Sequence, residues 1–305
     1  MMKFLLLVAS WAMLQLSPAA SSVLPFVVLH GISDECKHHG ITKFTTDLGT
    51  MSGAPGYCIE IGNGASDSWF LRLDKQVELA CKEIKLIPEL AGGYNIVGLS
   101  QGNLIGRGLI EWCDGPPVNN MVSLGGPHAG IASLPLCAAY SFCALADIIL
   151  HMGVYSDFVQ NHLAPTGYIK MPKDLSSYYR SCVFLPKLNN ELPQNRNATF
   201  KHRLSDLNQL VLVKFDKDTV LVPQETAWFG FFPPNDLTKV LPMEETALYK
   251  EDWIGLKSLH EQGRIQFVTF SGDHLSISDQ EMLDHVAPYL KPEKTRQREE
   301  HASIM

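Results

Sequence analysis

Short runs of apolar residues recur along the chain, bounded by Gly or Pro, at positions 26–29, 57–61, 95–99, 121–124, 210–215 and 265–270. Several of these runs are rich in Val and Ile and do not alternate strictly between apolar and polar positions. This pattern is typical of strands that are buried on both faces of a parallel sheet. The chain is therefore predicted to contain a mostly parallel sheet.

Helical patterns lie between these runs. Residues 71–84 carry apolar side chains at helical spacing, residues 103–112 follow a turn at Ser100, and residues 279–290 follow the last run. Alternation of strands and helices predicts a three-layer α/β domain, with helices flanking the sheet. We place this domain at residues 23–290.

The segment between Gly130 and Ser205 breaks this pattern. Residues 134–163 are apolar and have a largely helical sequence pattern, whereas residues 164–197 are rich in Pro, Asn and Tyr. An insertion of about 75 residues between two strands is too long for an ordinary loop. We expect an inserted cap subdomain at about 131–205, packed on the sheet.

The two ends of the chain differ from this domain. Residues 1–22 combine Lys3, an apolar stretch at 4–16 and small residues at 17–22, as a secretory signal peptide does. An apolar stretch of about 13 residues is shorter than the ~20 that span a bilayer, so a membrane anchor is not expected. Residues 291–305 are charged and aperiodic, which indicates a disordered tail. We expect a protein of the secretory pathway without stable membrane insertion.

Composition narrows the function further. The chain has 305 residues, of which 46% are hydrophobic and 19% are charged, which excludes a disordered or collagen-like chain. Its formal net charge is −7, and no run of Lys and Arg suits a phosphate backbone. We therefore expect no nucleic-acid partner.

The cysteine content is consistent with the secretory pathway. Disulfides persist in oxidising compartments, and an odd number of cysteines leaves at least one without an intramolecular partner. The glycosylation sequon Asn197-Ala198-Thr199 is consistent with a lumenal address, although such tripeptides also occur by chance. The seven cysteines are at positions 36, 58, 81, 113, 137, 143 and 182.

The strongest chemical signal is a G-x-S-x-G motif at residues 98–102, centred on Ser100. An apolar run precedes the motif and a helical pattern follows it. Small residues at both ends allow a sharp, strained turn that projects the serine hydroxyl above the edge of the sheet. We predict that Ser100 is a nucleophile. The alternative is an ordinary strand-to-helix turn with a capping serine.

An activated serine needs a base, which in this type of fold follows the acid in the order Ser, Asp or Glu, His. His274 follows the last predicted strand and directly precedes the final helix, so it can reach back over the sheet edge to Ser100. His30 and His128 come too early in the chain for this order. His274 is therefore the predicted base.

The acid is expected in the loop after the run 210–215, where Asp216 and Asp218 are both candidates. Asp273 is adjacent to His274 and cannot easily face its ring nitrogen. Asp216 lies close to the end of the strand, which leaves Asp218 as the predicted acid. Its role is to fix the imidazole tautomer and to stabilise the imidazolium.

An oxyanion hole of two backbone N–H groups completes this machinery. One comes from the residue after the nucleophile, Gln101, and the other from the loop after an early strand. In that loop Gly31 permits a tight backbone approach, so the N–H of Ile32 can point inward. The alternative for His30-Gly31 is a plain turn that ends the strand.

Together these residues resemble the palmitoyl-protein thioesterase family of α/β-hydrolases, over nearly the whole stretch from about 23 to 290. Several blocks in this order are far more specific than the serine motif alone. They are HG at 30–31, GGPHAG at 125–130, VKF at 213–215, Asp218, WFGF at 228–231, ETALY at 245–249 and GDHL at 272–275. The resemblance implies the α/β-hydrolase fold, a lysosomal or vacuolar address, and Asp218 as the acid.

The resemblance also implies covalent features. It implies the disulfides Cys81–Cys113 and Cys137–Cys143, and it places a glycan at Asn197. Animal members carry two adjacent cysteines after the His-Gly loop, and this chain departs from that pattern because it has the single Cys36 there. We expect Cys36 to pair with Cys58, which leaves Cys182 unpaired.

No cofactor or metal is expected. Cys36, His38 and His39 lie close together in the sequence, but no fourth ligand has a suitable spacing. Nor does the mechanism implied by Ser100 and His274 need a metal. The cluster is therefore expected to hold no ion.

The function that follows is hydrolysis of long-chain acyl thioesters, with S-acylated proteins or peptides and small thioesters as substrates. A lipid carboxylester hydrolase with the same triad is the alternative enzyme. A hydrolase-like binding module is less consistent, because such modules normally lose a catalytic residue. The apolar stretch 134–163 and an aromatic group are candidate walls for the acyl chain, although ordinary core packing also explains them. The aromatic group comprises Trp228, Phe229, Phe231 and Phe232.

Overall fold

The computed structural model describes residues 23–133 and 151–291. Three of the predictions above concern residues outside these ranges: the signal peptide at 1–22, the Cys137–Cys143 disulfide, and the tail beyond residue 291. The first part of the apolar stretch 134–163 also lies outside them. Within the described residues, no helix has the length and hydrophobicity needed to cross a bilayer.

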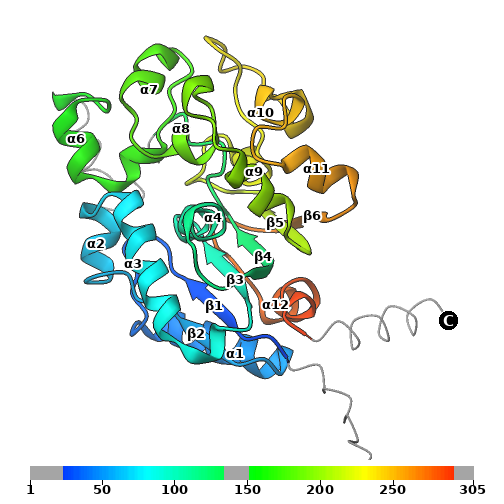
Figure 1. Ribbon diagram of the computed structural model, residues 1–305. Helices are drawn as coiled ribbons and strands as arrows, with labels where there is room; N and C mark the ends of the chain where they lie inside the picture. The colour runs from blue at the N-terminus through cyan, green and yellow to red at the C-terminus, as the bar shows by residue number, and fades with distance from the viewer. Residues whose placement is uncertain (1–22, 134–150, 292–305) are drawn as a thin grey trace, which may run out of the picture.

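A six-stranded sheet forms the centre of the molecule, with its strands in the order β2-β1-β3-β4-β5-β6 (Figure 1). All of its neighbouring strands pair in parallel. The strands are β1 (Phe26–Leu29), β2 (Gly56–Cys58), β3 (Tyr94–Leu99), β4 (Val118–Leu124), β5 (Gln209–Phe215) and β6 (Ile265–Phe270). The predicted parallel sheet is confirmed, with β1 and β6 at the predicted bounds.

Helices cover both faces of the sheet, as the three-layer prediction requires. Alternate residues of β1 enter different clusters: Val27 and Leu29 pack on one face, and Phe26 and Val28 on the other. The first face is covered by α3 (Leu73–Leu86) and α4 (Gly102–Trp112), and the second by α1 (His39–Ser52) and α12 (Asp279–His285). The inner strands β1, β3, β4 and β5 are largely buried on both sides, so they read as continuous apolar runs, whereas the edge strands β2 and β6 are partly exposed.

Two segments end earlier than predicted. Strand β2 ends at Cys58, so residues 59–61 leave the sheet soon after Ile59 N–H donates to the Val28 carbonyl. Helix α12 ends at His285 instead of continuing to residue 290. The chain there changes to a 3₁₀ turn that contains Pro288, which has no N–H to continue the helix.

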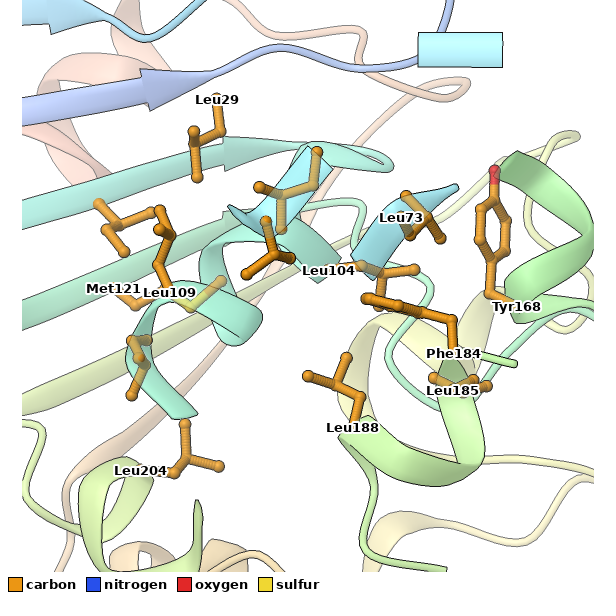
Figure 2. Packing of buried hydrophobic residues seen from close by; sticks show 14 of the residues in the cluster. Leu29, Leu73, Leu104, Leu109, Met121, Tyr168, Phe184, Leu185, Leu188 and Leu204 are labelled. Carbon is orange, nitrogen blue, oxygen red and sulfur yellow. The ribbon is translucent and has the colours of Figure 1, made fainter. Parts of the chain in front are cut away.

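The described part of the segment between β4 and β5 consists of short helices and shares the main core of the protein. Figure 2 shows Phe184, Leu185 and Leu188 from this segment beside Leu104 of α4, in one buried cluster. Its helix α9 (Ala198–Ser205) also packs on α4. The other elements of this segment are α6 (Asp157–His162), η2 (Ala164–Tyr168), α7 (Leu175–Ser181), α8 (Leu185–Leu188) and η3 (Pro193–Asn195).

The remaining helices are short. They are α2 (Ala65–Phe70), η1 (Pro88–Leu90), η4 (Gln224–Trp228), η5 (Met243–Glu245), α10 (Ala247–Lys250), α11 (Leu256–Glu261) and η6 (Ala287–Tyr289).

Two disulfides join elements of the domain. Cys81 of α3 is bonded to Cys113 at the end of α4, the pair that the family resemblance implies. Cys36, in the loop after β1, is bonded to Cys58 at the end of β2. Cys182 is buried and has a free thiol.

Candidate active site

Ser100 occupies a strained turn between β3 and α4. Its φ of 50° lies in the left-handed region, which non-glycine residues seldom adopt. The turn is fixed by neighbouring backbone, since Ser100 N–H donates to the Leu124 carbonyl at the end of β4 (2.9 Å). The Asn103 side chain donates to both the Ser100 and the Leu124 carbonyls. This is the geometry of a nucleophile elbow in an α/β-hydrolase fold.

The glycines of the motif are needed for close packing. A Cβ at Gly98 would overlap the Asn103 side chain, and a Cβ at Gly102 would overlap the Leu29 and His30 carbonyl oxygens. Helix α4 therefore starts in direct contact with the end of β1. The glycines allow the chain to turn this sharply against the sheet.

Ser100, His274 and Asp218 form a hydrogen-bonded row. The Nε2 atom of His274 lies 2.9 Å from Ser100 Oγ, and its Nδ1 atom lies 2.7 Å from Asp218 Oδ2. The three residues follow β3, β6 and β5, whose carboxyl ends meet at one edge of the parallel sheet. The Asp218 side chain is 1% exposed and that of His274 is 10% exposed. Such a row can transfer a proton from the serine to the imidazole.

Asp218 is held in place through its other oxygen. Its Oδ1 atom accepts N–H bonds from Val220 (2.9 Å) and Leu221 (2.8 Å), which leaves Oδ2 for His274. The other carboxylates considered for this role have different partners. Asp216 accepts the Gly272 N–H, whereas Asp273 accepts from Thr219 and from the backbone N–H of His274. The hydrogen bond from the His274 N–H is the largest cause that lowers the pKa of Asp273.

The imidazole of His274 rests between two neighbours. Gly125, at φ 59°, lies so close to it that an added Cβ would come within 3.0 Å of the His274 ring. The Phe215 ring meets the imidazole edge to face, with 6.2 Å between ring centroids. These contacts limit the positions open to the ring, and a larger residue at 125 would push it away from Ser100.

The candidate oxyanion donors lie beside the serine. Gly31 is so near the elbow that an added Cβ would be 3.3 Å from both Ser100 Cβ and the Leu99 carbonyl oxygen. Within the described part of the chain, neither the N–H of Ile32 nor that of Gln101 donates to another backbone group. The Gln101 side chain is instead anchored, because it donates to the Ser68 carbonyl at 2.7 Å. Both predicted donors are therefore available to a ligand.

A buried polar network that the sequence did not reveal lies behind the elbow. Arg107 of α4 is fully buried and binds Glu111 one turn later, as well as Asn189 of the segment between β4 and β5. Asn189 in turn donates to the His128 carbonyl. Desolvation raises the pKa of Glu111 to about 7, although Arg107 opposes this shift. The i, i+4 spacing of Arg107 and Glu111 was the one available signal in the sequence.

His128 belongs to this network, and its ring is buried instead of exposed to solvent. Its Nε2 atom lies 2.7 Å from Ser123 Oγ, and its ring stacks on Phe229 with centroids 4.6 Å apart. Burial lowers the pKa of His128 well below its ordinary value, which keeps the ring neutral. His128 therefore packs the interior, whereas His274 faces the serine.

The aromatic residues predicted as acyl-chain walls separate into two groups. Phe229, Phe231 and Phe232 line a cavity of about 170 Å³, which is also lined by Leu248 and by the charged residues Lys170 and Glu191. Trp228 lies elsewhere, because its indole N–H donates to the Leu212 carbonyl of β5 and its ring meets Phe267. Neither Ser100 nor His274 is among the residues that line this cavity.

The other predicted sites are placed as follows. Cys36 is bound in a disulfide and His38 pairs with Asp34, so these residues do not offer a common set of metal ligands. His30, Cys36 and Glu60 bring potential donor atoms within 4.8 Å of one another, but the disulfide removes the thiolate. Asn197 is exposed and caps α9 by accepting the Thr199 N–H.

Comparison with known proteins identifies the family of this chain. The chain is 37% identical over 267 residues to a Caenorhabditis elegans protein named palmitoyl-protein thioesterase 1, covering 85% of this chain and 88% of the other. It is 31% identical to a Xenopus laevis protein named lysosomal thioesterase PPT2-B, over 65% of this chain and 68% of the other. A solved esterase structure from Pyrococcus furiosus is 13% identical, with a TM-score of 0.46, and covers 88% of this chain and 81% of that one. Residues 25–274 match the palmitoyl protein thioesterase family, and the chain belongs to it.

Proposed function

We propose that this protein is a serine-dependent thioesterase that removes long-chain fatty acyl groups from cysteine sulfur. The observation that carries the proposal is the row of Ser100, His274 and Asp218, with contacts of 2.9 and 2.7 Å, at the strained turn of a member of this family. The substrate class is S-acylated proteins or peptides and acyl thioesters.

The mechanism proceeds through an acyl-enzyme. His274 Nε2 takes the proton of Ser100 as Oγ attacks the thioester carbonyl, while Asp218 holds the imidazole and stabilises its positive charge. The N–H groups of Ile32 and Gln101 bind the oxyanion of the tetrahedral intermediate. Collapse of the intermediate breaks the carbon–sulfur bond, and the leaving cysteine thiolate takes the proton from the His274 imidazolium, which returns the ring to its neutral form. Water activated by His274 then attacks the acyl-enzyme, which releases the fatty acid and regenerates Ser100.

The leaving group makes this chemistry easier than ester or amide hydrolysis. A cysteine thiol has a pKa of about 8.5, so its thiolate leaves far more readily than an alkoxide. The demanding step for the protein is therefore recognition of the acyl chain. Burial of the 14 methylenes of a palmitoyl chain, at about 0.8 kcal/mol each, supplies roughly 11 kcal/mol before ordering costs.

We assign part of this recognition to the cavity walled by Phe229, Phe231 and Phe232. Trp228 is left out, because it packs on β5 and β6. We also propose that the segment at about 131–205 acts as the cap over the site. Substitution of Phe231 by Ser should raise the KM for palmitoyl substrates more than the KM for short-chain thioesters. An equal effect on both would remove this cavity from the acyl site.

A lumenal location follows from the same proposal. Two disulfides suit an oxidising compartment, and one relative of this chain is named a lysosomal thioesterase. We propose that residues 1–22 direct the chain into the secretory pathway, that residues 23–290 form the hydrolase domain with a tail after it, and that the mature protein acts in a lysosome or vacuole. Asn197, which is exposed, would carry a glycan there.

The test compares two substrates with one enzyme preparation. A palmitoyl-cysteine peptide and a triacylglycerol are incubated with the wild type and with Ser100→Ala, and fatty acid release is measured. Preferential release from the thioester, abolished by the substitution, supports the proposal. Preferential release from triacylglycerol would favour a lipid carboxylester hydrolase, and release that survives Ser100→Ala would refute the assigned nucleophile.

A further inference from the structure

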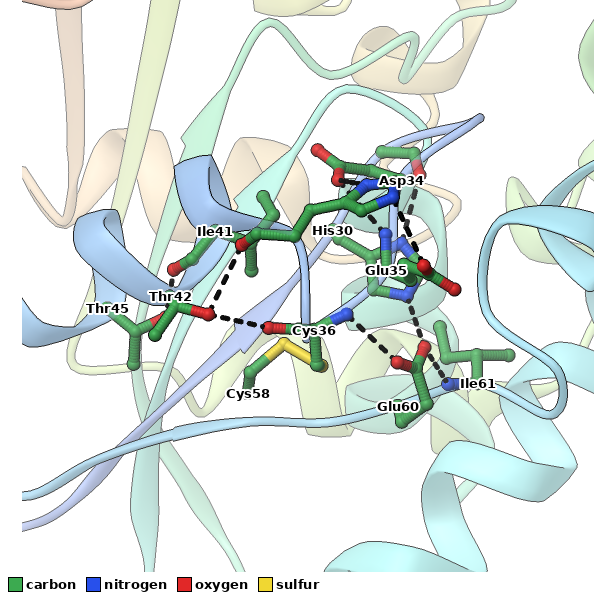
Figure 3. The surroundings of a disulfide bond; sticks show 12 residues. His30, Asp34, Glu35, Cys36, Ile41, Thr42, Thr45, Cys58, Glu60 and Ile61 are labelled. Atoms are coloured by element: carbon green, nitrogen blue, oxygen red, sulfur yellow. Dashed lines mark hydrogen bonds and ion pairs between the residues drawn. A yellow bond between two sulfur atoms is a disulfide. The ribbon is translucent and has the colours of Figure 1, made fainter.

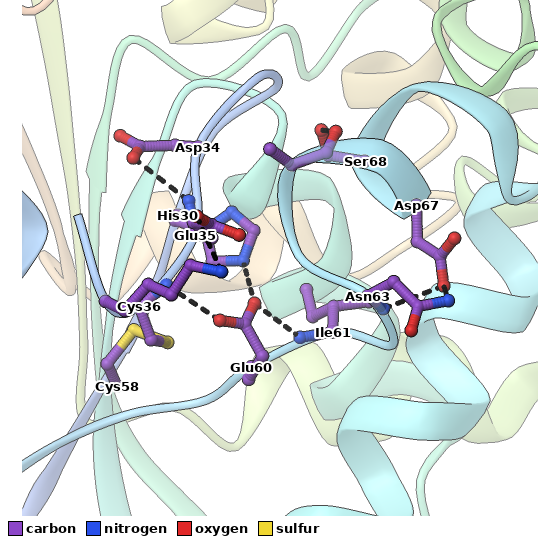
Figure 4. A network of polar contacts seen from close by, with 12 residues as sticks. His30, Asp34, Glu35, Cys36, Cys58, Glu60, Ile61, Asn63, Asp67 and Ser68 are labelled. Atoms are coloured by element: carbon purple, nitrogen blue, oxygen red, sulfur yellow. Dashed lines mark hydrogen bonds and ion pairs between the residues drawn. A yellow bond between two sulfur atoms is a disulfide. The ribbon is translucent and has the colours of Figure 1, made fainter.

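A second histidine–carboxylate pair lies beside the elbow, with His30 on the loop that follows β1 and Glu60 on the loop that follows β2. The His30 side chain is 1% exposed, and its Nε2 atom lies 3.0 Å from Glu60 Oε1. Figures 3 and 4 draw this contact as a dashed line. His274 already contacts Ser100, so the proposed proton transfer does not use this pair. Its burial next to the candidate oxyanion loop requires another explanation.

The other nitrogen of the His30 ring acts on the loop itself. Nδ1 lies 3.0 Å from the carbonyl oxygen of Gly31, the next residue. A carbonyl oxygen can only accept a hydrogen bond, so Nδ1 must carry the proton. The bond therefore holds the carbonyl of the Gly31–Ile32 peptide in one orientation.

Orientation of this carbonyl also orients a proposed oxyanion donor. The Gly31–Ile32 peptide is trans, so its C=O and N–H groups point in opposite directions within one plane. When His30 holds the Gly31 oxygen, the Ile32 N–H is directed to the other side. Gly31 packs directly on Ser100 at the elbow, so this is the peptide whose direction matters for an oxyanion.

Glu60 is fixed as firmly as the ring it binds. Its Oε2 atom accepts the Cys36 N–H at 2.9 Å, and its Oε1 atom accepts the Ile61 N–H at 3.1 Å in addition to the His30 contact. Both oxygens of Glu60 are thus held by backbone N–H groups, and its contact with Nε2 holds the His30 ring from the side opposite Gly31. The Cys36–Cys58 disulfide ties the same loop to β2 (Figure 4).

We propose that His30, held by Glu60, is a positioning residue that directs the Ile32 N–H toward the oxyanion. The inference rests on the proposed thioesterase function and adds to it a residue that acts through a peptide group. It makes a specific prediction about the two ring nitrogens. The bond from Nδ1 to Gly31 is the one that matters for turnover, and the contact from Nε2 to Glu60 supports it.

Two amide substitutions distinguish the roles of the two ring nitrogens of His30. In His30→Asn the side-chain NH₂ takes the place of Nδ1 and can still donate to the Gly31 carbonyl, but the contact with Glu60 is lost. In His30→Gln the NH₂ takes the place of Nε2, so it faces Glu60 and leaves the Gly31 carbonyl without its donor. His30→Ala removes both. Glu60→Ala is a fourth variant, at a side chain that is 38% exposed.

Steady-state kinetics on a palmitoyl-cysteine peptide gives the primary readout. Loss of one oxyanion donor typically lowers kcat by ~10²–10³, so His30→Gln and His30→Ala should lower kcat by at least ~10-fold with KM within about twofold. His30→Asn should keep kcat within about fivefold of the wild type. Glu60→Ala should fall between these variants, because the ring then lacks its support.

Inhibitor binding distinguishes positioning from a general structural role. An acyl trifluoromethyl ketone forms a tetrahedral adduct whose oxyanion uses the hole, whereas an acyl thioether occupies the site without forming one. His30→Gln should weaken the ketone in parallel with kcat and leave the thioether unchanged. His38→Ala is the matched control, because His38 also pairs with a carboxylate, Asp34, but has a half-exposed side chain. It should retain wild-type kinetics.

Several results would overturn the inference. One is retention of kcat in His30→Gln together with its loss in His30→Asn, since this would assign the function to the Glu60 contact alone. Equal weakening of the ketone and the thioether would indicate a structural role. If the His30 variants do not fold, Glu60→Ala with unchanged kcat and ketone affinity would refute the proposal. Activity in Ser100→Ala would instead refute the proposed function itself.

Discussion

The Asp218→Asn variant tests the geometry of the candidate triad most sharply, because the surroundings dictate how the new amide must lie. The Oδ1 atom of Asp218 accepts the N–H groups of Val220 and Leu221, so an NH₂ group placed there would face two donors. The amide oxygen of Asn therefore stays at this position. The NH₂ group then points at Nδ1 of His274, which the carboxylate contacts at 2.7 Å.

The consequence is the wrong imidazole tautomer. Facing a donor, Nδ1 of His274 becomes an acceptor and the ring proton moves to Nε2, which can no longer take the proton of Ser100. A carboxylate-to-amide change of this kind lowers kcat by ~10⁴, which corresponds to about 5.5 kcal/mol of lost transition-state stabilisation. We expect little change in KM, because Asp218 does not reach the acyl group.

The assay is thioester hydrolysis under saturating substrate, after the folding and the mass of each variant have been verified. Asp216→Asn is the matched control, since the Asn oxygen can still accept the Gly272 N–H that Asp216 binds at 2.9 Å. It should keep kcat within a few-fold. The reasoning fails if Asp218→Asn retains more than a tenth of the wild-type kcat, or if Asp216→Asn loses as much activity.

Three further predictions concern stability. Burial raises the pKa of Glu111 from 4.5 to about 7, so the folded protein holds a proton that the unfolded chain releases. The free energy of unfolding should therefore fall by about 3 kcal/mol as the pH rises from 4.5 to 7. Glu111→Gln should flatten this pH profile in urea unfolding, and an unchanged slope would contradict the prediction. Gly102→Ala forces a Cβ against the Leu29 carbonyl, so the melting temperature should fall by an amount equivalent to about 1–3 kcal/mol, and a wild-type value would contradict the packing described. Replacing Cys36 and Cys58 by Ser opens a loop with a sequence separation of 22, and should lower the free energy of unfolding by about 3 kcal/mol in non-reducing buffer but not in the presence of a reductant.

The inner strands of the sheet were predictable because they are largely buried on both sides. Residues 26–29 and 265–270 read as strands at their observed bounds, and the family blocks fixed the fold. Helix α1 escaped prediction because several Thr and Gly residues weaken its apolar pattern, although Ile41 and Leu48 mark its buried face. Pro288 interrupts the final helix, an effect that its apolar spacing alone conceals.

The candidate site divides in a similar way. Ser100 and His274 follow from motif and chain order, and the structure brings them together with Asp218. Contacts between distant segments were not predictable, such as that between Arg107 and Asn189, since no local pattern records them. Trp228 was grouped with the acyl-chain wall because an aromatic run does not reveal which face each ring occupies.

Covalent capture of Ser100 tests the central claim most directly. The folded protein is treated with a long-chain alkyl fluorophosphonate, digested and analysed by mass spectrometry, alongside Ser100→Ala. We predict a single adduct on the peptide that contains Ser100, and none on the variant. Absence of labelling in intact protein, or an adduct that persists in Ser100→Ala, would contradict the assignment of this serine as the nucleophile.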